Sequence, residues 1–430
     1  MFAAFDDTDS TESMCTTFLA TELVKALRVY DLIGLPRLVR LNPAVPWKTR
    51  GNGALCVRFG VGRGQGQMVG EIDGIPIYSY ERMYEEADRT TVLETAERIV
   101  QKWSRTTEGA SPGLVVSEGK PAQRLYWEAV RGIVEKEDTL RELQKIGADI
   151  VGWEGGRGII GASAAMAWRP HDRTYEIITY RSPDRWGTPR HLEDGSVRDM
   201  DLKYTTTFNN YDHRTDRRAI SPHTNCPVLF GVRGDDPTEL MNAVFSLRSE
   251  TPARWLMFLS NQGTDDHLIS AEPTLPDRSY DFKATVAEAP RTIAGGHVIV
   301  PVSISTGRLE AAAYEPTKEF RELVRALRPG DRVRLFGELR AEPRTLNIEK
   351  MQVISTVIER QKVSNPRCPE CGGSTKSMGS GGGYRCKKCG HRNELEAESV
   401  EVPRTIVPGW YEPPVCARRH LGKPLKRMRS

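Results

Sequence analysis

The stretch FAAFDDTDS, residues 2–10, decides how the N-terminal part of the chain folds. Its apolar first half predicts a buried strand, and its second half predicts an acidic turn at the end of that strand. The turn holds three carboxylates, those of Asp6, Asp7 and Asp9. Charges this close repel one another, and a hard divalent cation with oxygen ligands is the most direct compensation. The stretch therefore predicts a Mg²⁺ site, and a solvated acidic turn that caps the next helix is the alternative.

A helix is predicted directly after this turn. Apolar residues recur at helical spacing through the segment 15–30, and the polar residues before it supply three candidate N-caps, Ser10, Thr11 and Ser13. The hydroxyl groups of Thr16 and Thr17 then lie in the first turn of the helix. They are close to the three carboxylates in sequence, so the two groups are expected to form one site.

Length and composition describe an ordinary globular chain of several domains. The 430 residues predict two to four domains, and 38% hydrophobic with 27% charged residues is a typical composition. No run approaches the roughly 18 apolar residues of a membrane span, and the acidic residues near the N-terminus do not fit a secretory signal. We expect a cytoplasmic protein that does not associate with membranes.

Cysteine spacing gives the strongest local signal in the chain. Four of the eight cysteines form two CxxC pairs, Cys368 with Cys371 and Cys386 with Cys389, separated by 14 residues. Four thiolates at this spacing can surround Zn²⁺ as a tetrahedron, and in a reduced compartment a redox role is the weaker alternative. We predict a zinc ribbon over 362–395.

Positive charge is concentrated near the C-terminus. Residues 361–392 contain seven Lys and Arg with a single acid, and residues 416–430 contain six with none, although the whole chain has a net charge of only +4. A polyanion is expected to bind here. The candidate nucleic-acid-binding residues are Lys387, Lys388 and Arg392 in the ribbon, and Arg418, Arg419, His420 and Lys423 in a basic tail over 396–430.

The first 165 residues have the rhythm of an α/β domain. Strand-like runs at 36–41, 54–59, 113–117 and 149–153 alternate with helical stretches at 82–107 and 122–146. A Gly-rich loop, Gly60 to Gly66, matches neither GxGxxG nor the P-loop, so ATP chemistry here needs another architecture. Gly155, Gly156, Arg157 and Gly158 precede a run of small residues and suggest backbone amides that bind phosphate at a helix N-terminus; a tight turn packed on a sheet is the alternative.

Two further units follow in the chain. Strands near 174–180, 226–232 and 254–260, with a helix near 237–248, make 166–275 compatible with a ferredoxin-like module. The stretch 184–222 is predicted to be long loops, and Asp265 and His267 follow a strand, where ligands often bind. Residues 279–357 suggest five short strands with one helix at about 317–328, which indicates an OB-fold that binds nucleic acid.

Several long motifs resemble, in order and over nearly the whole chain, the archaeal enzymes that make agmatinylcytidine in an isoleucine tRNA. The motifs are DDTDS with MCTTF, GGRGIIGA (155–162), RTYEIITYR (173–181), CPVLFGVRG (226–234), NQGTDDHL (261–268), AYEPTKEFRELVRAL (313–327) and ARRHLGKP (417–424). Ala4, Ser13 and Phe18 depart from the family pattern, where two glycines and a tyrosine are usual. None of these changes removes a proposed ligand.

The resemblance implies a function. ATP is cleaved to AMP and phosphates, the carbon-2 carbonyl of the wobble cytidine is phosphorylated, and the primary amine of agmatine displaces the phosphate, so that the tRNA with a CAU anticodon decodes AUA. It also implies a kinase-like N-terminal domain, Asp6, Asp7 and Asp9 as Mg²⁺ and ATP ligands, and Thr16 as a phosphate acceptor with Thr17 beside it. The alternative is a noncatalytic protein that binds tRNA or other RNA through the OB-fold, zinc ribbon and basic tail.

Overall fold

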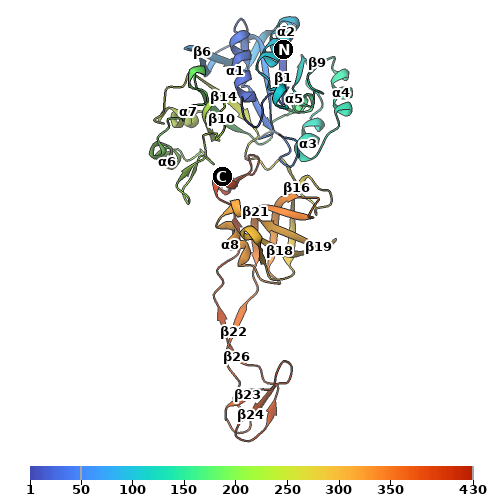
Figure 1. Ribbon diagram of the computed structural model, residues 1–430, viewed down its shortest axis with the longest axis vertical. Coiled ribbons are helices and arrows are strands. Elements are labelled where there is room, and N and C mark those ends of the chain that lie inside the picture. Colours follow the sequence, from blue (N-terminus) through green and yellow to red (C-terminus); the bar gives the residue numbers. More distant parts are fainter. Residues whose placement is uncertain (49–50, 429–430) are drawn as a thin grey trace.

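The computed structural model describes residues 1–48 and 51–428. It forms a large α/β body, a β-barrel below it, a two-stranded stalk and a small ribbon at the far end (Figure 1). The C-terminal segment returns from the ribbon to the junction of the body and the barrel, where Gly263 donates a backbone hydrogen bond to His420. Residues far apart in sequence therefore meet at this junction.

The body is built on a 12-stranded sheet of mostly antiparallel strands. Its strands are β1 (Phe2–Asp6), β2 (Asp31–Ile33), β3 (Arg37–Arg40), β4 (Gly53–Arg63), β5 (Gln67–Ile72), β6 (Ile75–Tyr80), β7 (Arg82–Glu86), β8 (Gly113–Ser117), β9 (Asp149–Gly152), β10 (Thr174–Tyr180), β13 (Val228–Gly234) and β14 (Arg254–Ser260). Strand β3 pairs with both β4 and β14, and β14 continues through β5, β6 and β2 back to β4. These six strands close a ring that joins the first and second parts of the chain.

Helices cover both faces of this sheet. They are α1 (Thr16–Ala26), α2 (Arg89–Trp103), α3 (Arg124–Arg131), α4 (Lys136–Lys145), α5 (Gly158–Ala167), α6 (Asp194–Lys203) and α7 (Pro237–Phe245). Ala3 and Phe5 of β1 share a core with α1 and α2, whereas Phe2 and Ala4 share another with α3, α4 and α5. Because its side chains alternate between two covered faces, β1 is buried along its whole length, as its continuous apolar run predicts.

The barrel below the body has the strand order of an OB-fold. Strands β16 (Arg278–Val286), β18 (His297–Ile304), β19 (Gly307–Ala313), β20 (Arg332–Leu339) and β21 (Thr345–Ser355) close into a ring in the order 1-2-3-5-4, and α8 (Phe320–Arg325) lies between the third and fourth strands. Short strands β15 (Leu268–Ile269), β17 (Arg291–Ile293) and β27 (Gly409–Tyr411) extend it.

The stalk pairs β22 (Glu359–Ser364) with β26 (Glu398–Val402), and the ribbon beyond it contains β23 (Thr375–Ser377), β24 (Tyr384–Cys386) and β25 (Arg392–Asn393). The chain then pairs β27 with β21 and ends in α9 (Leu425–Met428), beside the body. Both ends of the ribbon are thus connected to the barrel through the stalk.

Most of the predicted strands are confirmed, and several local predictions are wrong. Residues 82–86 form strand β7 before α2, residues 122–146 break into α3 and α4, and 184–222 contains α6 with a small hairpin, β11 (Tyr211–Asp212) and β12 (Arg217–Arg218). The Gly-rich run lies in β4 and its turn into β5, where Gly60 and Gly62 leave room for neighbouring strands and Tyr80. Cys15, and none of the three hydroxyl residues proposed, is the N-cap of α1.

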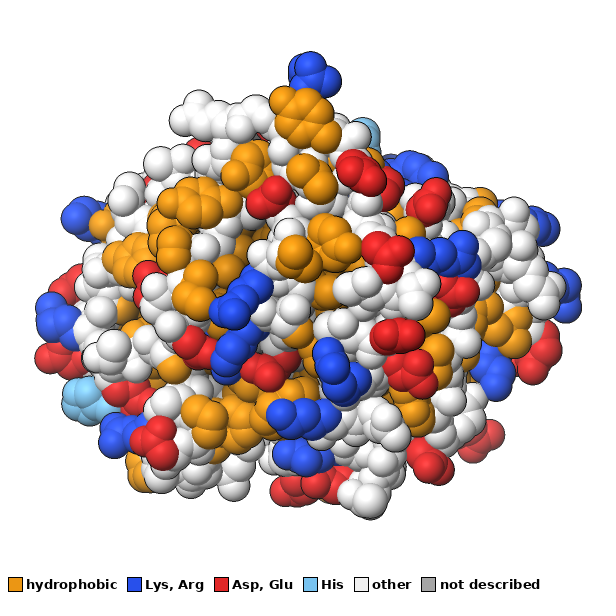
Figure 2. All heavy atoms as spheres, turned by 90° about the horizontal axis from the view of Figure 1, so that it is seen from above, with side chains coloured by type: hydrophobic (Ala, Val, Ile, Leu, Met, Phe, Trp, Pro, Cys, Tyr) orange, Lys and Arg blue, Asp and Glu red, His pale blue; other side chains and the backbone are white. Residues whose placement is uncertain are grey.

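Figure 2 shows the end of the body farthest from the ribbon. Acidic and basic side chains are mixed across this face, with hydrophobic groups between them. This end of the body therefore does not form a basic surface for a polyanion. In the part of the chain that the structure describes, no helix is long and apolar enough to cross a membrane.

Candidate active site

The acidic turn lies where β1 leaves the sheet. Asp6 is the last residue of β1 and is buried, and Asp7 adopts a left-handed conformation with φ of 54°. The Asp7 carboxylate accepts a hydrogen bond at 2.9 Å from Nη2 of Arg157, the residue directly before helix α5. Asp7 is therefore paired with a base, whereas none of the described bases forms an ion pair with the buried Asp6.

Burial makes this turn electrostatically unfavourable without a cation. Burial first, and then repulsion from Asp7, raises the pKa of Asp6 to about 8. Burial also raises the pKa of Asp7, although Arg157 opposes the shift. Carboxylates that are kept from ionising by one another and by burial are a preformed site for a positive charge.

Two glycines of α5 allow the helix to approach the acidic turn. A Cβ built on Gly161 would lie 1.8 Å from Asp6 Oδ2, and one built on Gly158 would lie 2.4 Å from the Asp6 carbonyl oxygen. Glycine at these positions is therefore required by close packing of α5 on the end of β1. The backbone at Gly155 and Gly156 has positive φ of 88° and 62°, which glycine adopts without strain.

Three backbone amides of this glycine segment are already bonded within the protein. Gly156 donates to the Trp153 carbonyl oxygen, Arg157 to Ser111 Oγ and Gly158 to the Ser111 carbonyl oxygen. These three bonds favour the tight turn, and the amide cradle for phosphate over Gly155 to Gly158 stays a prediction. The Arg157 side chain and Gly158 are the parts of this segment that line the cavity described below.

The two threonines face the same cavity from α1. Thr16 and Thr17 are the first residues of the helix, both side chains are largely buried, and the Cys15 Sγ and Thr17 Oγ1 atoms are 3.0 Å apart. No side-chain hydrogen bond of Cys15 caps the start of this helix. The N-terminal end of the helix dipole therefore favours negative charge near the Thr16 hydroxyl.

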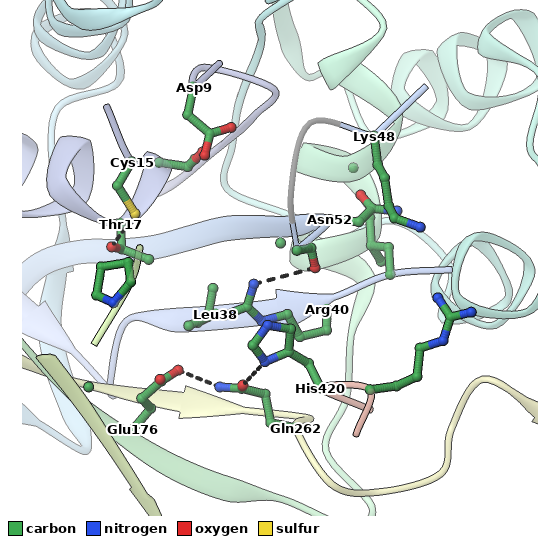
Figure 3. A pocket seen from close by; sticks show the side chains of 18 of the residues that line it. Asp9, Cys15, Thr17, Leu38, Arg40, Lys48, Asn52, Glu176, Gln262 and His420 are labelled. Atoms are coloured by element: carbon green, nitrogen blue, oxygen red, sulfur yellow. Dashed lines mark hydrogen bonds between the residues drawn. The ribbon is translucent and has the colours of Figure 1, made fainter. Parts of the chain in front are cut away.

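One cavity of about 550 Å³ collects these groups. This volume lies within the usual range of small-molecule sites, roughly 300–1,000 Å³. Asp6, Asp7, Asp9, Thr16 and Thr17 line it. Five further lining side chains were not predicted as site residues: Arg40, Lys48, Glu176, Arg233 and Gln262. Figure 3 shows four of them, Arg40, Lys48, Glu176 and Gln262. They come from β3, β10, β13 and nearby loops. Glu176, Arg233 and Gln262 lie in the quoted motifs 173–181, 226–234 and 261–268, whereas no motif marks Arg40 or Lys48.

The C-terminal tail contributes part of the cavity wall. Arg418, Arg419 and His420 line the cavity, and Lys423 lies outside it. Arg418 pairs with Glu412, Arg419 with Glu338 and Glu349, and Lys423 with Asp172. Arg418, Arg419 and Lys423, predicted as parts of a basic tail that binds nucleic acid, are thus paired with carboxylates of the protein, and His420 contacts Gln262. Only the tertiary fold places Arg418, Arg419 and His420 at the cavity.

Asp265 and His267 lie outside this cavity. The Asp265 carboxylate is 2.6 Å from Lys350 Nζ of the barrel, and His267 is buried with its Nε2 at 2.9 Å from Glu349 Oε2. The structure does not bring these two predicted site residues to the cavity, because both pair with β21 and join the body to the barrel. Burial opposes ionisation of Glu349, but the contact with His267 holds its pKa below the usual value.

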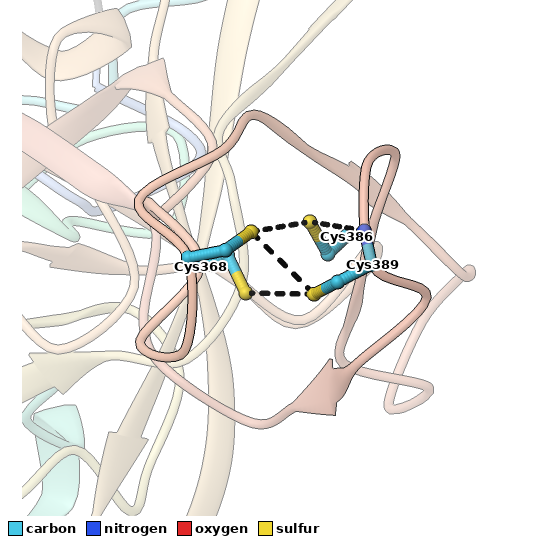
Figure 4. Close-up of side chains that lie close together, drawn as sticks. Cys368, Cys386 and Cys389 are labelled. Carbon is cyan, nitrogen blue, oxygen red and sulfur yellow. Dashed lines mark hydrogen bonds between the residues drawn. The ribbon is translucent and has the colours of Figure 1, made fainter.

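The four predicted zinc ligands meet in the ribbon. The Sγ atoms of Cys368, Cys371, Cys386 and Cys389 all lie within 4.8 Å of one another, and three of the pairs are 3.5 to 3.7 Å apart (Figure 4). A tetrahedron with Zn–S bonds of about 2.3 Å has edges of about 3.8 Å, so the geometry fits Zn²⁺. Within the described chain this is the one group of three or more metal-binding side chains at such distances.

The acidic turn differs from the cysteines in this respect. Asp6, Asp7 and Asp9 line the same cavity without placing three carboxylate oxygens around one point. Mg²⁺ commonly uses one or two carboxylates with water and substrate phosphates, and this donor set fits that pattern. Lys387, Lys388 and Arg392 are exposed on the ribbon, far from the cavity.

The fold and the site define a multidomain enzyme with a nucleotide-sized cavity and appended nucleic-acid-binding folds. Three family models match the chain: the TiaS TCKD domain at residues 2–154, the TiaS FLD domain at 156–267 and the TiaS C-terminal zinc ribbon domain at 365–406. TiaS of Methanocaldococcus jannaschii, a 2-agmatinylcytidine synthetase that acts on an isoleucine tRNA, is 36% identical, with 99% of this chain and 98% of that protein covered. The chain belongs to the TiaS family.

Other relatives agree along the full length. The TiaS of Methanosarcina mazei is 38% identical, with 99% of this chain and 97% of that protein covered. The crystal structure of TiaS in complex with isoleucine tRNA and ATP superposes with a TM-score of 0.85 at 34% identity, covering 99% of this chain and 97% of that one. A complex of TiaS with isoleucine tRNA, AMPCPP and agmatine gives 0.84 at 32% identity, covering 100% and 97%.

Proposed function

We propose that the protein uses ATP to attach agmatine to the wobble cytidine of the isoleucine tRNA with a CAU anticodon. The observation that carries the proposal is the cavity that brings the acidic turn and both threonines together, in a chain that matches these synthetases from end to end. A noncatalytic RNA-binding scaffold gains nothing from buried, mutually repelling carboxylates. The synthetase is therefore favoured over the binding-protein alternative.

We assign the parts of the chain as follows. Residues 1–165 form a kinase-like domain that binds ATP, 166–275 a ferredoxin-like module, and 279–357 the OB domain that contacts tRNA. The ribbon at 362–395 presents Lys387, Lys388 and Arg392 to the tRNA backbone, and 396–430 returns to complete the cavity. We also assign the protein to the cytoplasm, where its tRNA and ATP are found.

ATP is expected to lie between the acidic turn and the arginine and lysine side chains that also line the cavity. Mg²⁺ held by carboxylates among Asp6, Asp7 and Asp9 would neutralise phosphate charge and stabilise charge that develops during transfer. Arg157, which contacts Asp7, is placed to bind the same phosphates. The buried Asp6 carboxylate supplies the negative charge that only a cation can stabilise there.

Thr16 is the proposed phosphate acceptor in this chain. It lies in the first turn of α1 and lines the same cavity as the acidic turn. The helix N-terminus would stabilise the phosphate that Thr16 would carry. Thr17 is next to it and contacts Cys15. Transfer of phosphate to the cytosine carbonyl oxygen converts a poor leaving group into phosphate, which departs with that oxygen when the agmatine amine bonds to carbon 2.

The experiment pairs Asp7→Asn with Thr16→Val. Asparagine tolerates the left-handed backbone of Asp7 and removes only the charge, so ATP turnover should be lost while tRNA affinity and thermal stability are kept. Thr16→Val removes the acceptor hydroxyl at nearly constant volume, so incubation with γ-labelled ATP should leave the protein unlabelled.

Asp277→Asn is the matched control, because Asp277 has a similar φ of 57° and lies outside the cavity. It should keep wild-type AMP release and agmatine incorporation. Wild-type AMP release by Asp7→Asn, or label at the α1 start in Thr16→Val, would remove the N-terminal turn from the active site.

A further inference from the structure

A chain of hydrogen bonds sets the proton position on His420. The Gln262 side chain donates its Nε2 to Glu176, and its Oε1 accepts from Arg233 Nε at 3.1 Å. The amide orientation is thus set by an acid on one side and a base on the other. Because His420 Nδ1 lies 3.1 Å from the same Oε1, which can only accept, His420 must carry its proton on Nδ1.

The other ring nitrogen of His420 is therefore an acceptor. The positive charge of Arg40 first, then burial and Arg233, hold the pKa of His420 well below its usual value, so the ring is neutral at physiological pH. His420 keeps exposed surface in the cavity that it lines. Among the described residues Nε2 has no hydrogen-bond partner, so its lone pair can accept from a ligand there.

Arg40 supplies donors beside this acceptor (Figure 3). Among the described residues its buried Nε has no hydrogen-bond partner and no carboxylate lies within ion-pair distance of its guanidinium, while its Nη1 donates to the Gly51 carbonyl oxygen at 3.4 Å. A Cβ built on Gly51 would lie 2.6 Å from Arg40 Nη1 and 3.4 Å from His420 Nε2, so both atoms border the same point of the wall. Agmatine carries two positive charges, so the positively charged Arg40 repels it from this part of the cavity. A neutral ligand that has a hydrogen-bond donor next to an acceptor matches the His420 acceptor and the Arg40 donors.

We infer that His420 Nε2 accepts a hydrogen bond from the exocyclic amine of a nucleobase, while Arg40 donates to the neighbouring acceptor on the same base edge. This inference rests on the proposed function. Cytosine and uracil share the carbon-2 carbonyl at which the reaction takes place, so the enzyme must distinguish them elsewhere on the base. Cytosine presents an amine where uracil presents a carbonyl oxygen, which would face the His420 lone pair unpaired.

The adenine of ATP has the same kind of edge, so two bases could fill this position. Two assays distinguish the wobble cytidine from ATP, because each assay changes only one of these substrates. The first arm compares tRNA with cytidine or uridine at the wobble position. The second arm compares ATP with inosine triphosphate, in which a carbonyl replaces the amine.

The variants are His420→Gln, whose amide can accept or donate, and His420→Ala, which does neither. In one arm the wild-type enzyme should prefer the amine-bearing substrate over the carbonyl-bearing one. The ratio of their kcat/KM values in that arm should be about 10- to 100-fold lower in both variants than in the wild type. A purely structural role would lower both rates of a pair equally and leave the ratio unchanged. His191→Gln, at an exposed histidine outside the cavity, is the matched control and should keep both ratios.

The outcomes separate the inference from the function on which it rests. If the variants lower the kcat/KM ratio of cytidine-bearing to uridine-bearing tRNA, His420 and Arg40 contact the wobble base. If they lower the ratio of ATP to inosine triphosphate, the two residues contact adenine. Wild-type ratios in both arms for both variants overturn the inference. Failure of the wild-type enzyme to incorporate agmatine into cytidine-bearing tRNA overturns the proposed function itself, whatever the variants do.

Discussion

Replacing Gly161 by alanine tests whether the close approach of α5 positions the Asp6 carboxylate. The added Cβ would lie 1.8 Å from Asp6 Oδ2, whereas ordinary contact begins at 3.4 Å, so the carboxylate must move by about 1.6 Å. The helix cannot retreat easily from the sheet, because it also packs against α3 and α4 in a shared apolar core. Asp6 therefore has to rotate out of its place.

Stability and activity should respond differently to this change. Overpacking costs about 1–3 kcal/mol, and replacing glycine in a helix returns up to about 1 kcal/mol, so the free energy of unfolding should fall only slightly. A misplacement of about 1 Å in a catalytic group can cost about 100-fold in rate. We expect ATP turnover to fall by that order while the melting temperature changes by a few degrees.

The assay is AMP release under single-turnover conditions, with thermal melting measured on the same samples. Gly195→Ala is the matched control, because a Cβ on Gly195 of α6 meets nothing within 4 Å. It should leave turnover unchanged. Turnover within about threefold of wild type in a folded Gly161→Ala protein would refute the view that α5 positions Asp6 for catalysis.

Three further predictions concern charge and metal. Burial raises the pKa of Asp6 to about 8 in the native protein, against about 3.9 in the unfolded chain. Without added Mg²⁺ the free energy of unfolding should therefore fall as pH rises between these values. Asp6→Asn should then melt higher than wild type at pH 8 but not at pH 4, and equal melting curves at pH 8 would contradict this. The purified protein should contain one zinc ion per chain, and Cys371→Ser with Cys389→Ser should lose it without changing the melting of the body, as metal analysis and calorimetry would show. Excision of 363–399, which joins the paired stalk strands, should weaken tRNA binding and flatten its salt dependence but keep self-labelling by ATP. Truncation after residue 360 should abolish self-labelling, because Arg418 to His420 line the cavity. Equal labelling of both proteins would show that the C-terminal segment is dispensable.

Local signals identified the parts of the protein whose structure depends on neighbours in sequence. The apolar run of β1, the acids that follow it and the helical spacing of α1 are contiguous, and the structure places them as predicted. The two CxxC pairs bring their four thiolates together because each pair already lies in one short turn. The alternation of apolar and polar residues in each barrel strand is likewise visible within a single stretch of sequence.

The tertiary structure alone decided which distant side chains share the cavity. Arg40, Gln262 and His420 are separated by more than a hundred residues at each step, and they meet because β3 pairs with β14 while the C-terminal segment folds back to the body. Asp265 and His267 were misplaced because a strand end shows where a chain leaves a sheet, but not toward which neighbour it turns. Their partners Lys350 and Glu349 lie in another domain. Contacts between segments depend on how whole elements pack, and the side-chain pattern of either segment alone does not contain that information.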